Sequence, residues 1–119
     1  MPALTRVLGA ATAAYSAAII VWPKVLASPC GLTTATGKVR PEIRVLIGAI
    51  GARDTAIGVA MVCAPKGPAL KAALAARVTA DAADAVLFGT QLPERKARAK
   101  VAAFATGWAV LCALSAFAP

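Results

Sequence analysis

The sequence predicts an all-α integral membrane protein, folded as an antiparallel, up-down four-helix bundle. Hydrophobic residues make up 60% of the 119 residues, and alanine supplies most of the excess over an ordinary soluble domain. Ala, Leu, Val and Ile stand in long runs that favour helices, and few aromatic or β-branched blocks suggest strands. Each run is close to the ~20 residues that a helix needs to cross a bilayer.

Prolines mark the boundaries of four helices in one transmembrane domain, residues 1–119. Pro41, Pro68 and Pro93 stand where the first turn of a helix tolerates proline. The helices are expected at about residues 3–22, 42–64, 69–91 and 94–118. A soluble alanine-rich bundle is the alternative, but the last run lacks the polar face that a soluble helix needs. The connection 25–40, VLASPCGLTTATGKVR, is either a loop or a short re-entrant segment.

The net charge of +8 follows the pattern of membrane loops and does not indicate nucleic-acid binding. Loops 23–41 and 92–100 hold seven basic residues, against three at the other ends of the helices. The positive-inside rule therefore places both loops in the cytoplasm and both termini outside, in the cytoplasmic membrane if the protein is bacterial. The basic loops would meet anionic lipid, either as simple anchors or as specific binding sites.

Nothing in the sequence indicates a metal or a cofactor. The chain has no histidine, and its three cysteines, Cys30, Cys63 and Cys112, do not form a CxxC motif. No motif for a nucleotide, a flavin or haem is present. We therefore expect neither a metal site nor a cofactor, and any chemistry should depend on side chains alone.

Charged residues inside two of the predicted spans are the feature that calls for a function. Arg53 and Asp54 stand in the second span, in GARDTAIG, and the third span holds Arg77, Asp81 and Asp84. The last three share one helix face with Phe88, at spacings of four, three and four. A short turn joins the two spans, so we expect them to lie antiparallel and adjacent, with the five charges at one depth.

These five groups should pair, since each alone costs about 2.5–3.5 kcal/mol to insert into a membrane. Two arginines against three carboxylates leave one carboxylate without a cation, and this group is the candidate proton carrier. Around them, Gly48, Gly51, Thr55 and Gly58 repeat at helical spacing and predict close helix packing. Tyr15 in the first span and Trp108 in the fourth could complete a pocket, or serve only as core residues.

The segment GARDTAIGVAM, followed about 25 residues later by ARVTADAADAVLFG, resembles a known family. This is the small four-helix membrane protein family catalogued as domain of unknown function 4267. The resemblance implies four helices, with a Gly-x-Arg-Asp motif in the second and an Asp-rich third. It singles out Gly51, Arg53, Asp54 and Gly58, together with Asp81 and Asp84. The family name carries no activity.

Three functions are open at this point. The first is a cofactor-free acid–base cyclase or isomerase that acts on a lipophilic, isoprenoid- or polyketide-like molecule from the bilayer. Asp54 would be its acid, Asp81 the partner of Asp54, Asp84 a further acidic group, and Arg53 and Arg77 electrostatic supports. The second is an accessory or assembly subunit of a membrane complex, whose charges form a structural lock. The third is a small proton-linked carrier, which at this length would need a second copy of the chain.

Overall fold

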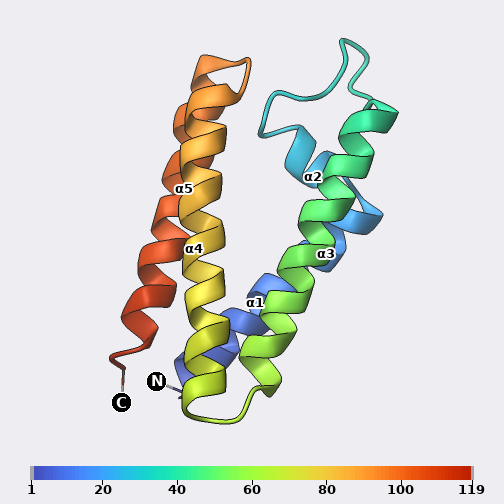
Figure 1. Ribbon diagram of the computed structural model, residues 1–119. Helices are drawn as coiled ribbons and strands as arrows, with labels where there is room; N and C mark the ends of the chain where they lie inside the picture. Colours follow the sequence, from blue (N-terminus) through green and yellow to red (C-terminus); the bar gives the residue numbers. More distant parts are fainter. Residues whose placement is uncertain (1, 119) are drawn as a thin grey trace.

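The computed structural model describes residues 2–118, which form five α-helices and no strand (Figure 1). The four long helices are α1 (Pro2–Val21), α3 (Pro41–Cys63), α4 (Pro68–Gln91) and α5 (Arg95–Ser115). A single helical turn, α2 (Lys24–Ala27), follows α1 directly. The prediction of four helices is therefore wrong, because a turn as short as α2 leaves no periodic pattern in the sequence.

Three of the helices, α1, α3 and α5, are long and apolar enough to cross a membrane. The predicted span at 69–91 corresponds to α4, which is not one of these candidates among the described residues. Its 24 residues include Lys71, Arg77, Asp81 and Asp84, and these charges lower its mean hydropathy. The four-span prediction is thus corrected to three candidate spans, and these three support a membrane location.

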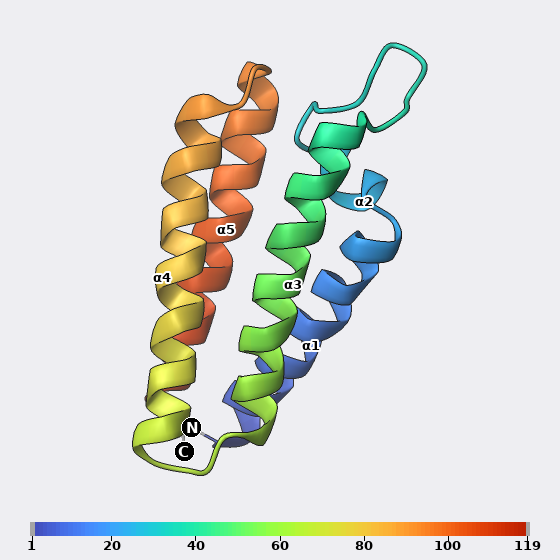
Figure 2. The same cartoon turned by 45° about the vertical axis from the view of Figure 1, so that its right-hand side comes forward.

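The long helices form two pairs, α1 with α3 and α4 with α5 (Figures 1 and 2). The pairs meet at the end that holds both termini and the turn between α3 and α4, and they diverge toward the opposite end. We call these the terminal end and the loop end. The sequence predicted that α3 and α4 would be antiparallel and adjacent, and they are in contact, although α3 packs more extensively against α1.

Glycines bring α1 and α3 into contact. A Cβ atom at Gly58 would lie 2.7 Å from both the Ala13 nitrogen and the Gly9 oxygen, and one at Gly51 would lie 2.7 Å from the Ser16 oxygen. Only glycine permits this approach of two backbones. Gly48 differs, because a Cβ atom there would meet no atom within 4 Å, so close packing is not found at that position.

The apolar core is continuous at the terminal end and divided at the loop end. At the terminal end one cluster draws on all four long helices and contains Leu8, Met61, Ala73, Leu74 and Cys112. At the loop end one cluster contains Ile19, Ala27 and Ile47, and another contains Cys30, Leu92 and Ala97. Leu26 and Leu32 pack against both loop-end clusters, so the connection between α1 and α3 joins the two helix pairs there.

The predicted connection 25–40 holds most of α2 and, after it, a tight turn. Backbone pairing between Thr33 and Val39 closes this turn, and the Gly37 nitrogen donates a hydrogen bond to the Thr34 oxygen at 2.8 Å. Gly37 has a φ of 78°, a conformation that side-chain-bearing residues rarely adopt. The connection therefore folds as a short helix followed by a closed turn, and its Leu26 and Leu32 pack between the helix pairs at the loop end.

Candidate functional site

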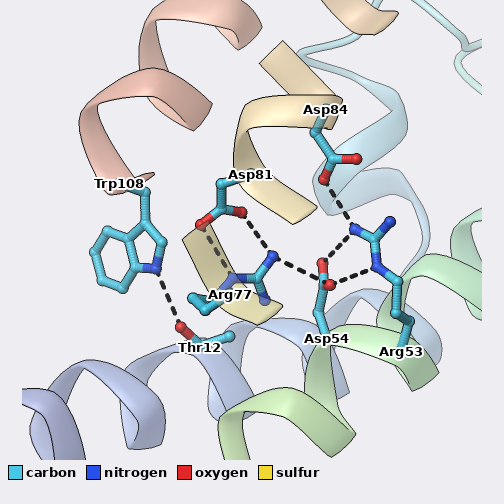
Figure 3. A network of polar contacts seen from close by, with 7 residues as sticks. All are labelled: Thr12, Arg53, Asp54, Arg77, Asp81, Asp84 and Trp108. Atoms are coloured by element: carbon cyan, nitrogen blue, oxygen red, sulfur yellow. Dashed lines mark hydrogen bonds and ion pairs between the residues drawn. The ribbon is translucent and has the colours of Figure 1, made fainter. Parts of the chain in front are cut away.

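The five charged residues singled out in the sequence form one network between the helix pairs (Figure 3). Arg53 and Asp54 come from α3, and Arg77, Asp81 and Asp84 come from α4. Ion pairs across the interface join the two helices, and through them the two helix pairs. The turn at 64–67 makes this possible, since it places residues at similar distances from the turn at similar depths.

Arg77 is the buried centre of the network, with only 1% of its surface exposed. Its Nε and Nη2 atoms donate hydrogen bonds to the two carboxylate oxygens of Asp81, at 3.0 and 2.6 Å. The same Nη2 atom lies 3.2 Å from Oδ1 of Asp54 on α3. Four residues separate Arg77 and Asp81, the spacing at which side chains on one helix face meet. A buried guanidinium therefore has two carboxylates as partners.

Arg53 forms the outer half of the network and is more exposed. Its Nε atom donates to Oδ1 of Asp54 at 2.7 Å, and its Nη2 atom donates to Oδ2 of Asp54 at 3.2 Å. Nη2 also donates to Oδ2 of Asp84 at 2.9 Å. Arg53 thus bridges neighbouring carboxylates from α3 and α4.

The three carboxylates differ in how many of their oxygens are occupied. Both oxygens of Asp54 and both oxygens of Asp81 accept hydrogen bonds from guanidinium groups. Asp84 uses only Oδ2, and no donor among residues 2–118 contacts its Oδ1. A bound molecule could therefore reach Asp84 without displacing an arginine.

All charges in the body of α4 face inward. Arg77 and Asp81 are buried and Asp84 is half-buried, whereas the exposed face between them carries Thr79, Ala82 and Ala83. Phe88 continues the inward stripe by one further turn, as its spacing from Asp84 predicts. Between residues 77 and 84 the helix thus presents its charges to the interior and small, uncharged residues to its surroundings.

A cavity of about 280 Å³ lies beside the network, between the two helix pairs. Its polar wall consists of Asp54, Arg77, Asp81 and Asp84. The other walls are mostly apolar and come from all five helices: Ala11, Thr12, Tyr15, Ser16, Ile19, Leu26, Ile50, Phe88, Val101, Phe104, Ala105 and Trp108. Leu26 belongs to α2, so the connection at the loop end contributes to the enclosure.

Aromatic residues from both helix pairs line the cavity, including Tyr15 and Trp108, which the sequence singled out. Trp108 stacks on Phe104 with ring centroids 6.4 Å apart, and Tyr15 lines the cavity from α1. The Trp108 indole nitrogen donates to the Thr12 hydroxyl at 3.1 Å, a contact between the two helix pairs (Figure 3). Sequence reasoning missed Thr12, because a single threonine in an apolar run has no distinguishing pattern.

The glycines predicted to pack closely lie outside this site. Gly51 and Gly58 face α1, and Thr55 stands between them with a buried hydroxyl that has no hydrogen-bond partner among the described residues. Their role is to bring α1 and α3 together, which sets the position of Asp54 relative to the cavity. Within residues 2–118, no group of three or more His, Cys, Asp or Glu side chains could hold a metal ion.

Comparison of the chain with models of protein families, with curated proteins and with solved structures finds no match. The resemblance to domain of unknown function 4267 therefore stays a prediction. What the site does is inferred from its geometry.

Proposed function

We propose that this membrane protein binds a lipophilic small molecule in the cavity and rearranges it by acid–base chemistry without a cofactor. The observation that carries the proposal is that four residues of the Asp/Arg network, Asp54, Arg77, Asp81 and Asp84, form one wall of a cavity whose other walls are mostly apolar. Such a combination of apolar walls and a few convergent polar groups is typical of small-molecule sites. The cavity volume, about 280 Å³, lies just below the usual range of about 300–1,000 Å³, which favours a small substrate.

The chemistry that fits is cyclisation or isomerisation of an isoprenoid- or polyketide-like compound. A carboxylic acid would donate a proton to an alkene, epoxide or carbonyl, and a neighbouring carboxylate would accept a proton from another carbon of the substrate. The overall reaction moves atoms within one molecule, so it needs no oxidant, reductant or activated group. Apolar walls protect a developing cation from water.

Asp84 is the best candidate for the group that exchanges a proton with the substrate. From the sequence we expected Asp54 to be the acid, but both of its oxygens accept hydrogen bonds from arginines. Asp84 lines the cavity, and its Oδ1 atom has no partner among the described residues. We therefore assign the acid role to Asp84, with Asp81 nearby as a second carboxylate and with Arg53 and Arg77 as electrostatic supports.

Identifying the small molecules that copurify with the protein tests the proposal. Full-length wild type and Asp84→Asn would be purified in mild detergent from the native host, and bound compounds would be identified by mass spectrometry. We expect both proteins to retain a lipophilic compound, with the wild type holding mainly product and the variant mainly its unreacted isomer. Glu42→Gln is the matched control, since it removes a carboxylate that is exposed and outside the cavity.

Two results would overturn the proposal. One is a wild type that retains no lipophilic compound beyond bulk lipid. The other is an Asp84→Asn protein that holds the same compounds in the same ratio as wild type and Glu42→Gln.

A second candidate function is that of an accessory subunit, in which the network only locks the helices together. The observation that favours it is that both arginines contact carboxylates of α3 and α4. This function predicts a stoichiometric protein partner in a mild-detergent purification and an unfolded Asp84→Asn protein. A lock needs no cavity beside it, and for that reason we place the small-molecule function first.

A further inference from the structure

A second hollow, separate from the cavity, lies at the loop end between α1, α3 and the turn at 33–39. We call it the basic groove. Its volume is about 410 Å³, and it is lined by Val21, Trp22, Pro23, Lys24, Gly37, Lys38, Val39 and Arg44. Three of these residues are cations, and none is acidic.

The three cations of the basic groove have no anionic partner among the described residues. Glu42 is the nearest acid along the chain, and it pairs with Arg40 at 3.4 Å, outside the groove lining. Like charges that share a concave site repel one another, and an anion placed among them relieves the repulsion. The groove therefore has the electrostatic character of an anion site.

The fold brings two of these basic residues to the groove. The turn that presents Lys38 is closed by the Thr33–Val39 pairing, and the Thr34 nitrogen donates to the Lys38 oxygen at 2.8 Å. A Cβ atom at Gly37 would lie 3.3 Å from the Lys24 ammonium nitrogen, so glycine leaves room for Lys24 over the turn. The basic residues thus come from three segments that the turn brings together.

The groove also has an apolar side that faces outward. Val21 ends the candidate span α1 and Trp22 follows it directly, and the two residues are 64% and 63% exposed. Tryptophan at the end of a span is typical of the membrane–water interface. The lysines and the arginine of the groove would contact the anionic head group of a lipid. Val21 and Trp22 would contact its acyl chain.

We propose that the basic groove binds the phosphate group of an anionic lipid. The ligand class is a phosphodiester lipid with net negative charge, such as phosphatidylglycerol. The alternatives are a free phosphate ion and diffuse attraction of any basic loop to an anionic surface. This site does not depend on the chemistry proposed for the cavity.

The experiment measures lipid binding to the full-length protein in a nonionic detergent. Short-chain phosphatidylglycerol, short-chain phosphatidylcholine and inorganic phosphate are titrated separately. The groove variant carries Lys24→Gln, Lys38→Gln and Arg44→Gln, all at exposed positions whose loss should not affect folding. The control variant carries Arg95→Gln, Lys96→Gln and Lys100→Gln, three exposed cations at the same end of the molecule.

We expect phosphatidylglycerol to bind the wild type more tightly than either other ligand. Each basic residue near an anionic surface contributes roughly fivefold in binding, so the groove variant should lose about tenfold or more. The control variant should lose less than about twofold, because its cations do not line the groove. Arginine at the two lysine positions should preserve binding.

Equal losses in the groove and control variants would overturn the proposal in favour of diffuse attraction. Inorganic phosphate that binds as tightly as phosphatidylglycerol would overturn it in favour of a free-anion site. Unchanged binding in the groove variant, with a native helical spectrum, would also overturn it.

Discussion

The guanidinium of Arg77 on α4 lies 3.2 Å from the carboxylate of Asp54 on α3, and this contact joins the two helix pairs. Arg77 also binds Asp81 on its own helix, so one buried cation has two carboxylates as partners. Taken singly, each charge would be costly in an apolar environment, at about 2.5–3.5 kcal/mol. Together they form a network that lines the cavity, which is why the same residues serve both the fold and the proposed chemistry.

Replacing Arg77 should cost more stability than replacing any other arginine of an ion pair. Arg77→Gln leaves Asp54 and Asp81 buried without that cation, and breaking a buried pair in this way typically costs about 3–5 kcal/mol. Arg40→Gln is the control, because Arg40 and Glu42 form an exposed pair worth about 0–1 kcal/mol. Thermal unfolding in detergent compares the two, and equal melting temperatures would contradict a structural role for Arg77.

Two glycines of α3 should respond to alanine in opposite ways. Gly58→Ala places a methyl group against the backbone of α1, and such overpacking typically costs about 1–3 kcal/mol. Gly48→Ala meets open space, and alanine is the better helix former by about 1 kcal/mol, so this variant should be as stable as wild type or more so. Denaturation of both variants in the same detergent is the measurement. Equal destabilisation would mean that α1 and α3 do not pack as described.

Filling the cavity should abolish ligand retention without touching the charged network. Ala105 lines the cavity and is 7% exposed, so Ala105→Phe would occupy much of the space that a ligand needs. Ala103 stands two residues away on the exposed face of α5, and Ala103→Phe is the matched control. Mass spectrometry of the compounds that copurify with each variant gives the answer. If Ala105→Phe retained as much compound as wild type, the ligand would have to bind outside this cavity.

The sequence predicted the charged cluster better than it predicted the helix packing. Arg77, Asp81 and Asp84 repeat at helical spacing, so their common face follows from helix geometry alone. The pairing of α1 with α3 depends on Gly9 and Ala13 meeting Gly58, and nothing in one sequence says which small-residue faces will meet. The counts of helices and spans were wrong because α2 is a single turn and α4 carries four charges.

The occupancy of the carboxylate oxygens was also beyond sequence reasoning. Counting two arginines against three aspartates predicts one carboxylate without a cation. In the structure each carboxylate contacts an arginine, and Asp84 accepts only one of these hydrogen bonds. Which of the three carboxylates has the fewest arginine contacts depends on side-chain rotamers and on the distance between α3 and α4. These place Arg53 between Asp54 and Asp84, and Arg77 between Asp54 and Asp81.

Thiol labelling should distinguish the three cysteines and also test the orientation in the membrane. Cys63 is exposed at the end of α3, near the terminal end, whereas Cys30 and Cys112 are buried. Burial raises the pKa of the Cys30 thiol to about 11, so near neutral pH almost none of it is the reactive thiolate. A maleimide should therefore modify one thiol in the folded protein near neutral pH and three after denaturation.

The positive-inside prediction places the terminal end outside the cell, so a membrane-impermeant maleimide should label Cys63 in intact cells. Cys63→Ser is the control and should remove this label, because the other two thiols are buried. Labelling of Cys63 only in inverted membrane vesicles would reverse the predicted orientation. In that case the basic groove would face the outside and would meet the lipids of the outer leaflet.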